Sequence, residues 1–527
     1  KGHMQESAGN DYQNLSLNNI TVTVYATQLN SEFDSFNNTY DEGAEYNPTI
    51  VTSSDEAEIA LSANKENIYV DLARDVSFDV NEGENKLLGG VDTKLIVIDG
   101  KGCKLTFNNK NNNSGIVSRE GTKLVIKNAV IDNSGYNEAG GTWDTHDIIF
   151  NNHNSEVQLE NVTFTNAVAL SGKATLTDVK ISDKKATQAA YLLWIVEGSE
   201  VELNNVTIDG KSTVGEANRA IAIKNQYVPG KYGNGGNTTL TVNGLTATSD
   251  KYAAIYVTSN NATTVNLNGA IDITETAVKD KVVQRDSNST GEITVNDNST
   301  KVVKAASQDE LANAITSVEA GKSAKVDLGA GTYTLPEMSG KDVTIVGTKD
   351  TVIDVSTGSA HHGATIALEG VTVKGQTSGN FEGLKHTAKV VYKDCKITEK
   401  HTLYAKDTEF VNCVFEQTAA DYNLWTYGGN VTFTDCTFIS NGKFINAYRQ
   451  QNTADGEVTN LTLTNCKFVN TGSANKAAVN IKSQMAWNVI ITSCTTEGEF
   501  PAENNGLWQS APDDGAAEAP GNKVTVN

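Results

Sequence analysis

One short pattern recurs twelve times in this chain of 527 residues, six times in each half. Counted from a central residue at position 0, apolar residues stand at −5, −3, 0 and +2, and a small polar residue stands at −1. The spacing between centres varies from 17 residues (162 to 179) to 39 residues (206 to 245). A short unit that repeats at irregular intervals predicts a solenoid with loops of different lengths. The centres are Ala129, Val162, Val179, Val206, Leu245 and Ala270 in the first half, and Val371, Cys395, Cys413, Cys436, Cys466 and Cys494 in the second.

The positions within the pattern predict two short strands and a corner in each coil. Residues two apart lie on one face of a strand, so −5 and −3 form one inward pair, and 0 and +2 form another. Because the step from −3 to 0 is odd, the chain must turn between the pairs. The residue at −1 is Asn, Asp or Gly in eleven copies and Ser493 in the last, and the first three types tolerate left-handed backbone angles. The pattern therefore predicts an all-β fold, a parallel β-helix.

The two halves are copies of one another. Ala253 precedes Ala270 by the same 17 residues by which Ala477 precedes Cys494 (270 − 253 = 494 − 477). Each half also opens with a Ser-x-x-Glu capping box, at residues 53–56 and 307–310, which predicts a short helix over the end of each stack. We expect a first β-helix over residues 48–300 and a second over 301–527. Residues 1–47 would hold a tag remnant, then either an N-terminal strand or a leftover coil, LSLNNITVT.

The charge of the chain limits the classes of partner that it can bind. It carries 64 acidic against 42 basic residues, a net charge of −22, which argues against nucleic acid and anionic membranes as partners. No run approaches the roughly 18 consecutive apolar residues of a membrane span, so we expect no membrane insertion. No Asp-x-Asp-x-Asp-Gly loop is present. We expect no cofactor, with structural calcium left open as an alternative.

The six cysteines fit the interior better than a metal or disulfide site. Five of them occupy position 0, where the first half carries Val, Leu or Ala. This exchange predicts an interior ladder of free thiols that pack as small hydrophobic side chains. Adjacent coils lie about 4.8 Å apart, so a disulfide between neighbours stays open as an alternative. Zinc sites need close Cys-x-x-Cys spacing, which is absent here.

The template, the capping helix and the phrases VDLGAGTYTL and VTIVGTKDTVIDV resemble the pectin-lyase-like right-handed parallel β-helix superfamily. The tandem, Asn-rich and acidic form is similar to the pectate-lyase-like adhesive modules of large bacterial surface proteins. This resemblance implies two tandem right-handed β-helices with a non-catalytic role, as an adhesin or a stalk, in a longer chain at the bacterial cell surface. The superfamily also contains lyases and hydrolases, so its fold alone does not decide the activity.

Catalysis has little support in the sequence. The chain has five arginines, Arg74, Arg119, Arg219, Arg285 and Arg449, and none lies in a segment that resembles the arginine motifs of pectate lyases. The carboxylate pair of a glycoside hydrolase has no counterpart either, because the one Asp-Asp pair is at residues 513–514 in a polar stretch. His153 and His386 occupy equivalent places without an assignable partner. We expect no enzyme, with a polysaccharide lyase or hydrolase as the alternative.

Aromatic residues next to the third strand of each coil are the candidate site. If Leu424, Thr426, Ile445 and Ala447 face inward, Trp425, Tyr427, Phe444 and Tyr448 face outward from adjacent coils. Such rings stack on sugars, and Asn446, Arg449 and Gln451 would bond hydroxyls. Trp194 and Tyr256 hold comparable places in the first half, and a long insert carries Trp143, His146 and Asp147 as a weaker candidate. The expected partner is a glycan or a host or matrix surface. The alternatives are rings covered by loops as ordinary core, and a purely structural spacer.

Overall fold

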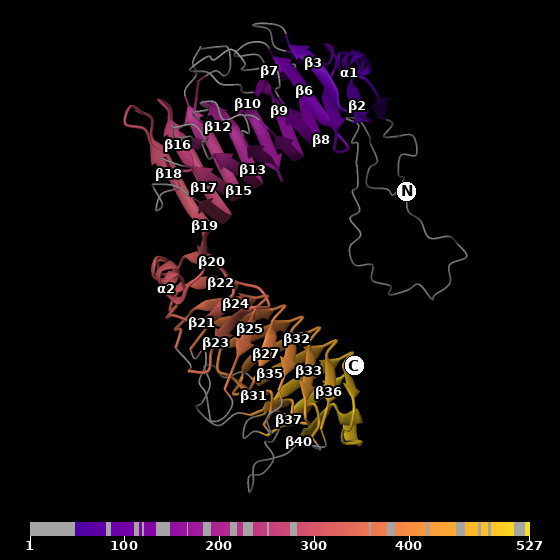
Figure 1. Ribbon diagram of the computed structural model, residues 1–527, viewed down its shortest axis with the longest axis vertical. Helices are drawn as coiled ribbons and strands as arrows, with labels where there is room; N and C mark the ends of the chain where they lie inside the picture. Colours follow the sequence, from indigo (N-terminus) through magenta and orange to yellow (C-terminus); the bar gives the residue numbers. More distant parts are fainter. Residues whose placement is uncertain are drawn as a thin grey trace, which may run out of the picture.

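The computed structural model (Figure 1) describes most of the chain from residue 48 onward. The described residues are 48–80, 86–109, 115–118, 121–132, 148–165, 167–182, 191–210, 219–224, 235–249, 252–274, 282–357, 360–376, 384, 386–417, 421–448, 459–472, 476–482, 486–510 and 522–527. The expectations for residues 1–47 lie outside this part of the chain. No helix within it is long and apolar enough to cross a membrane.

In the described part of the first half there are one helix and nineteen strands. They are α1 (Ser54–Leu61), β1 (Thr49–Val51), β2 (Asn67–Leu72), β3 (Val76–Val80), β4 (Lys86–Leu88), β5 (Leu95–Asp99), β6 (Lys104–Asn109), β7 (Gly115–Ser118), β8 (Lys123–Asp132), β9 (Ile148–Phe164), β10 (Val168–Thr177), β11 (Lys180–Ser182), β12 (Tyr191–Val196), β13 (Glu200–Gly210), β14 (Arg219–Lys224), β15 (Thr238–Ser249), β16 (Ile255–Thr258), β17 (Thr263–Thr274), β18 (Val283–Arg285) and β19 (Ile293–Ala305).

The second half follows β19 with a second helix, and a short 3-10 turn, η2 (Glu503–Gly506), lies near its end. Its elements are α2 (Gln308–Thr316), β20 (Ser323–Leu328), β21 (Gly331–Thr334), β22 (Asp342–Val346), β23 (Thr351–Asp354), β24 (Thr365–Glu369), β25 (Thr372–Lys374), β26 (Lys389–Lys393), β27 (Lys396–Thr398), β28 (His401–Leu403), β29 (Asp407–Val411), β30 (Val414–Glu416), β31 (Leu424–Thr426), β32 (Gly429–Thr434), β33 (Thr437–Ser440), β34 (Ile445–Ala447), β35 (Thr459–Thr464), β36 (Lys467–Asn470), β37 (Val479–Ile481), β38 (Asn488–Thr492), β39 (Thr495–Glu497), β40 (Trp508–Ser510) and β41 (Lys523–Val526).

Strands of successive coils pair side by side and in parallel, which confirms the expected all-β parallel solenoid. In the second half, β20, β22, β24, β26, β29, β32, β35, β38 and β41 follow one another in one sheet. An eight-stranded sheet runs from β21 to β39, and a five-stranded sheet runs from β28 to β40. Each later coil of this half thus contributes one strand to each of three sheets, and the core lies between them.

The corner between the two inward pairs has the predicted backbone conformation in all twelve coils. The φ angle at position −1 lies between 51° and 55° for the nine non-glycine corners and between 66° and 110° for Gly244, Gly269 and Gly370. These values are in the left-handed region, where Asn, Asp and Gly are favoured. Corner side chains also bond from coil to coil: the Asn412 amide donates to Asp394 at 2.6 Å, and the Asn161 amide donates to Asn128 at 2.9 Å. The prediction of a corner at −1 is confirmed.

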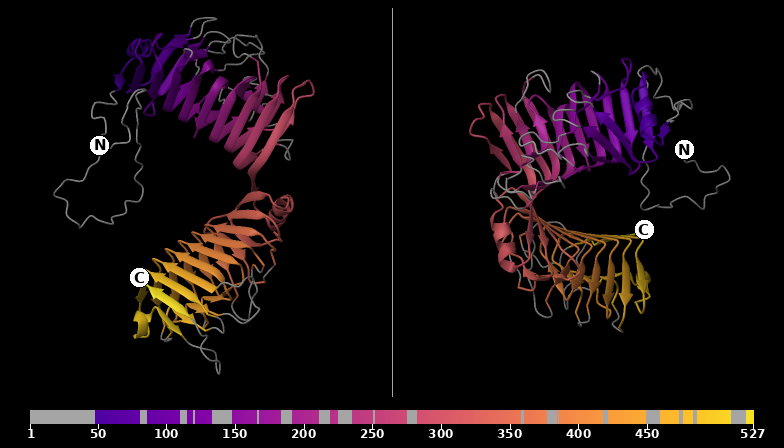
Figure 2. Two further views of the ribbon diagram at one scale, coloured as in Figure 1. Left: turned by 180° about the vertical axis from the view of Figure 1, so that it is seen from behind. Right: turned by 45° about the horizontal axis from the view of Figure 1, so that its top comes forward.

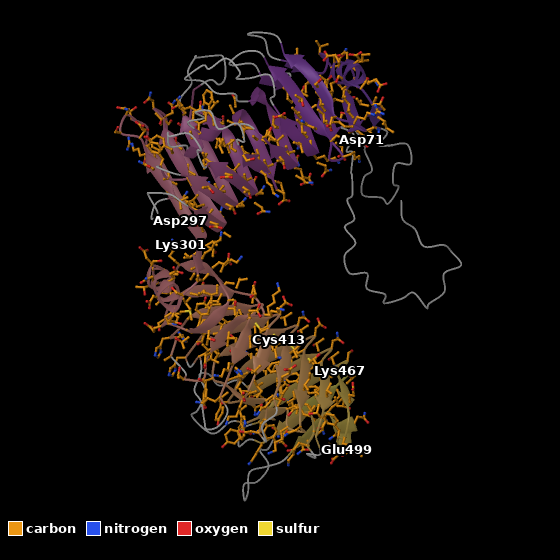
Figure 3. All side chains as sticks on the ribbon, viewed as in Figure 1. Asp71, Asp297, Lys301, Cys413, Lys467 and Glu499 are labelled. Carbon is orange, nitrogen blue, oxygen red and sulfur yellow. The ribbon has the colours of Figure 1, made fainter. Side chains whose placement is uncertain are left out.

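The buried apolar side chains form one large cluster in each half. The first runs from Val51 to Ile271 and the second from Ala305 to Leu507. All six cysteines are free thiols, and the four from Cys395 to Cys466 are buried in the second cluster, while Cys494 is half-buried against it. Figure 3 places Cys413 within the second stack. The interior ladder of free thiols is therefore confirmed.

Each large cluster includes the inner face of a short helix. The hydroxyl of Ser53 accepts the N–H of Glu56 at the start of α1, and that of Ser307 accepts the N–H of Glu310 at the start of α2, both at 3.3 Å. Ala57 and Leu61 of α1 join the first cluster. Leu311, Ala314 and Ile315 of α2 join the second. A serine N-cap supplies an acceptor for an otherwise unpaired N–H of the first turn.

Strand β19 belongs to both stacks. Residues 293–302 pair with β17, and residues 300–305 pair with β20, so only Thr300–Val302 have a strand on each side. Figures 1 and 2 show the two stacks meeting there and diverging on either side, and Asp297 and Lys301 mark the place in Figure 3. The expected boundary between the two β-helices, at residues 300 and 301, falls inside β19. Since both stacks share this strand, the boundary stays a prediction.

Candidate functional site

The five-stranded sheet of the second stack holds the candidate site. Its inward residues Leu424, Thr426, Ile445 and Ala447 are all fully buried, as the alternation predicts. The residues between them, on the outward face, form a column that runs from coil to coil in register. That column is Thr402, Trp425, Asn446, Asn480 and Gln509.

Three tyrosines and one tryptophan pack together on this outward face. We call Tyr404, Trp425, Tyr427 and Tyr448 the aromatic cluster. The rings of Tyr404 and Tyr427 stack with centroids 4.6 Å apart, and Tyr448 meets Tyr427 edge-on at 5.2 Å. Trp425 meets Tyr448 edge-on at 5.4 Å. These are favourable offset and edge-to-face geometries for aromatic pairs.

Neighbouring polar groups fix the orientation of Trp425. Its indole Nε1 donates to Asp421 Oδ1 at 3.1 Å, and the other carboxylate oxygen of Asp421 lies 3.1 Å from Lys400 Nζ. Tyr422 packs edge-on against the indole at 5.6 Å, and Lys443 Nζ lies 5.9 Å above the Tyr422 ring. Burial, with the nearby charge of Asp421, raises the pKa of Tyr422 to about 12. Tyr422 is therefore a neutral phenol at any physiological pH.

Most of the aromatic cluster is covered. Tyr427 is 7% exposed and Tyr448 is 8% exposed, whereas Trp425 is only half-buried. Of the two alternatives for the aromatic stripe, the covered one therefore holds for these tyrosines, because their rings pack on one another. Trp425 is the ring of this cluster with substantial exposed surface.

Phe444 does not face outward, which corrects the prediction from the sequence. Its ring is fully buried in the core of the second stack, edge-on to Phe468 at 5.6 Å and stacked on Phe500 at 5.3 Å. Phe444 lies just before β34 begins, at the corner that leads into the strand. The alternation of the strand therefore does not extend to it.

Asn446 faces outward but is also fully buried. Its Oδ1 accepts the Asn480 amide at 2.9 Å, and Asn480 Oδ1 in turn accepts the Gln509 amide at 2.8 Å. The Asn446 Nδ2 has no partner in the described part of the chain, but the whole side chain is buried, so a ligand at the surface does not reach it. The expectation that Asn446 contacts ligand hydroxyls is therefore wrong, while Arg449 and Gln451 lie outside the described residues.

The comparable residues of the first half are buried as well. Trp194 and Tyr191 pack together, and Lys224 Nζ lies 6.0 Å and 5.6 Å from their ring centroids. The Tyr256 hydroxyl donates to Asp286 at 2.5 Å, and its ring meets Tyr252 at 4.9 Å. The outward column therefore carries aromatic rings in both halves, but the rings of the first half are buried.

The remaining sequence candidates come together only in part. Trp143, His146 and Asp147 lie outside the described residues. His386 stacks on His362 with centroids 4.6 Å apart, while His153 lies in β9 of the other stack. Within the described residues no group of three or more His, Cys, Asp or Glu side chains is arranged to hold a metal ion.

Sequence reasoning missed Lys400, Tyr404, Asp421 and Tyr422. Tyr404 had a usable signal, because it follows the last residue of β28 just as Tyr427 follows β31 and Tyr448 follows β34. Lys400 and Asp421 had no comparable signal in the sequence. Their contact joins two loops whose lengths differ from coil to coil.

No known protein family matches the sequence, and no curated protein matches it. Among solved structures, the PL6 family alginate lyase AlyGC is 11% identical with a TM-score of 0.26, over 91% of this chain and 100% of that one. An arginine-to-alanine mutant of the same lyase is 11% identical with a TM-score of 0.25, over 90% and 100%. The Agl-KA catalytic domain is 15% identical with a TM-score of 0.17, over 87% and 62%. These scores support no inference from those proteins to this chain.

Proposed function

We propose that this chain is a non-catalytic glycan-binding module and that Trp425 is the centre of its binding surface. The observation that carries the proposal is a partly exposed tryptophan held in one orientation on the outward face of a sheet. Asp421 fixes its Nε1, and Tyr422 and Tyr448 support its ring edge-on. A ring that is already oriented loses little conformational freedom when a sugar stacks on it.

Two charged side chains lie near Trp425: Asp421 bonds its Nε1, and Lys443 lies over the adjoining ring of Tyr422. Asp421 and Lys443 are both half-buried, so each keeps exposed surface for a ligand. A carboxylate and an ammonium group beside an indole suit the alternating apolar faces and hydroxyls of a pyranose. The ligand class in this proposal is therefore a glycan rather than a nucleic acid, for which the net charge of −22 is unfavourable.

The proposed setting follows the resemblance of the sequence to adhesive modules. We infer two tandem right-handed β-helices of the pectin-lyase-like kind, each closed by its helix, in a longer protein at the bacterial cell surface. There the module would contact a glycan or a host or matrix surface. The solenoid holds the site rigidly, because each coil is paired with its neighbours along the whole stack.

A glycan array tests the binding site directly. We expect the wild-type chain to bind a subset of glycans and Trp425→Ala to lose that binding. Tyr448→Phe should keep it, because the supporting ring is retained. Trp194→Ala is the matched control from the same column of the first half. Binding that survives Trp425→Ala but is lost with Trp194→Ala would move the site to the first half and overturn the proposal.

A second assay separates binding from catalysis. The chain is incubated with polyuronates and neutral glycans, with and without Ca²⁺, and the solution is followed in the near ultraviolet and for new reducing ends. We expect neither signal. Unsaturated ends would identify a lyase and new reducing ends a hydrolase, and either would refute a purely binding role. Absence of both binding and turnover would leave the spacer role instead.

A further inference from the structure

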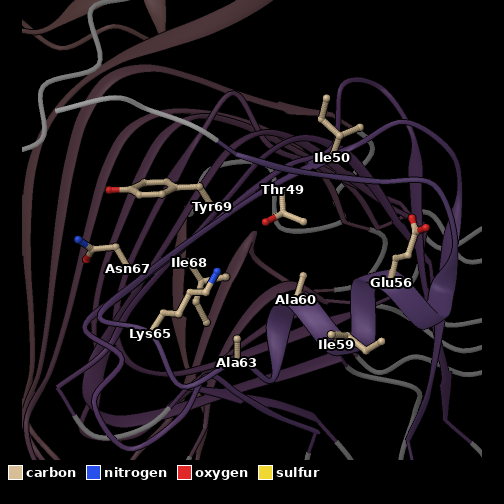
Figure 4. Close-up of a pocket in the computed structure, with 10 residues that line it drawn as sticks. All are labelled: Thr49, Ile50, Glu56, Ile59, Ala60, Ala63, Lys65, Asn67, Ile68 and Tyr69. Atoms are coloured by element: carbon tan, nitrogen blue, oxygen red, sulfur yellow. The ribbon is translucent and has the colours of Figure 1, made fainter. Parts of the chain in front are cut away.

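Lys400 carries its charge inside the fold. Its side chain is 7% exposed, and its Nζ lies 3.1 Å from Asp421 Oδ2. Lysine usually keeps its ammonium group in water, and Lys65, beside the hollow of about 440 Å³ between α1 and β2 (Figure 4), is exposed in this way. In the other ion pairs described between β20 and β39, the lysine side chains are 38% to 50% exposed. The burial of Lys400 therefore calls for a reason.

Neighbouring coils carry no lysine at this place. The residue just before β28 is Lys400, and the residues just before β31, β34 and β37 are Asn423, Phe444 and Ala478. The three later strands pair in register with β28 and with one another, so these four residues stand in one column. An amide, a ring and a methyl group fill the corner in the next three coils. Packing of the coil alone therefore does not account for the charge of Lys400.

The main chain holds Lys400 in a fixed place. Its N–H donates to the Gln376 carbonyl and its carbonyl accepts the Gln376 N–H, both at 3.0 Å. The next residue, His401, donates its N–H to the Asn423 carbonyl at 2.9 Å. The segment that carries Lys400 is thus bonded to the coil on either side.

Asp421 links this ammonium group to the indole of Trp425. Its Oδ2 lies against Lys400, while its Oδ1 accepts the Trp425 Nε1–H at 3.1 Å and the Tyr422 N–H at 2.8 Å. The Asp421 side chain is 38% exposed, so without Lys400 it can turn toward water. A buried ammonium group, in contrast, costs free energy unless a carboxylate stays beside it. Lys400 therefore keeps Asp421 in the place where it accepts from Trp425.

We propose that Lys400 is a positioning residue of the glycan site and acts by holding Asp421 against Trp425. The inference rests on the proposed function of Trp425. With Lys400 in place, the indole has one orientation before a sugar arrives, so binding orders little. Without it, the carboxylate turns to solvent, the indole loses its acceptor, and the sugar has to order the ring as it binds.

The variant Lys400→Met tests the positioning role without any ligand. Methionine keeps an unbranched apolar chain in the buried site and removes the charge, so the stack should be at least as stable as in the wild type. The chain has five tryptophans, and Trp425→Phe identifies the indole N–H resonance of Trp425 in ¹H–¹⁵N spectra. We expect this resonance to shift in Lys400→Met, and its exchange with D₂O to become about tenfold faster or more, because the bond to a charged acceptor is lost.

Two further variants make the comparison specific. Lys400→Asn, which installs the residue of the next coil, removes the charge with a different shape and should change the Trp425 resonance in the same way. Lys396→Met removes an exposed lysine of β27 that pairs with Glu416. This matched control should leave the resonance unchanged. Thermal unfolding checks that each variant is folded.

Affinity for a glycan found on the array gives the second readout. We expect Lys400→Met to bind about three- to tenfold more weakly than the wild type, the usual cost of ordering one side chain, and Lys396→Met to bind like the wild type. An unchanged Trp425 resonance in both Lys400 variants would overturn the positioning role, whether or not a glycan binds. A changed resonance in a chain that binds no glycan would refute the proposed function of Trp425 and leave its link to Lys400 standing.

Discussion

The corner residue at position −1 is held at positive φ in every coil, and in several coils its side chain also bonds to the corner of an adjacent coil. Asn412 shows both features, with a φ of 52° and an amide bond to Asp394. In this region the Cβ of an ordinary residue crowds the backbone, at a cost of roughly 1–2 kcal/mol. The amide bond partly offsets that cost, which accounts for Asn at this corner.

Two substitutions at Asn412 separate these contributions. Asn412→Gly removes the hydrogen bond but keeps a relaxed backbone, whereas Asn412→Val removes the bond and adds strain. We expect Asn412→Val to be the less stable of the two by about 1–2 kcal/mol, because only valine has a Cβ at positive φ. Urea unfolding followed by far-ultraviolet circular dichroism measures the difference. Equal midpoints for the two variants would contradict the assigned strain.

Two buried histidines of the second stack make its stability depend on pH. Burial lowers the pKa of His361 from 6.5 to about 4, while Glu337 acts weakly in the opposite direction, and burial lowers the pKa of His401 to about 4 as well. His361 is neutral in the fold, where its Nδ1 accepts the N–H of Met338 at 3.2 Å. Between pH 6.5 and 4 the unfolded chain therefore binds protons that the folded chain does not, so stability falls as the pH falls through this window.

The variant His361→Asn isolates this effect, because asparagine keeps an acceptor near Met338 and does not titrate. We expect the melting temperature of the wild type to drop more steeply than that of His361→Asn between pH 6.5 and 4. Above pH 7 the difference between the two proteins should be constant. Parallel curves across the whole range would show that His361 titrates alike in both states.

At the scale of elements, the core of the second stack is lined by an aromatic ladder. Tyr392, Phe410 and Phe433 stack on successive coils with centroids 4.4 Å and 4.9 Å apart. Phe415, Phe438 and Phe468 form a second column beside it, at 4.3 Å and 4.7 Å. The first stack fills the place of Phe433 with aliphatic residues such as Leu203 and Val242. Removal of a ring here leaves a cavity that the paired coils above and below cannot close.

Phe433→Ala should therefore destabilise the second stack by about 3–5 kcal/mol, the usual cost of truncating a buried phenylalanine. Thr432→Ala, one residue away on the outward face, is the matched control and should change stability by less than about 0.5 kcal/mol. Calorimetry of both variants against the wild type measures the two effects. A Phe433→Ala protein as stable as the control would contradict a tightly packed ladder.

The same elements show what the sequence could and could not predict. Corners and inward residues follow from local chemistry, namely left-handed tolerance at −1 and a period of two in each strand. Phe444 lies outside a strand, where that period does not apply, and its partners Phe468 and Phe500 are distant in sequence. The burial of Asn446 and the contact of Asp421 with Trp425 depend on how loops of unequal length fold over the sheet. No local sequence pattern predicts which loop covers which part of the sheet.

At the scale of the whole molecule, the proposed glycan site belongs to the second stack alone. The aromatic cluster lies on the five-stranded sheet of that stack. The two stacks have separate cores and share β19. Because the cores are separate, Trp425→Ala should leave the unfolding of the first stack unchanged, which calorimetry of the variant measures.

The most direct measurement is a calorimetric titration of the chain with a glycan that binds on the array, compared with Trp425→Ala under the same conditions. If the indole carries the contact, affinity falls by about tenfold or more, since a loss of about 1.4 kcal/mol is tenfold in Kd. Circular dichroism and melting of the variant establish that the stack is intact. An unchanged Kd for a folded Trp425→Ala protein would contradict the assignment of the aromatic cluster as the binding site.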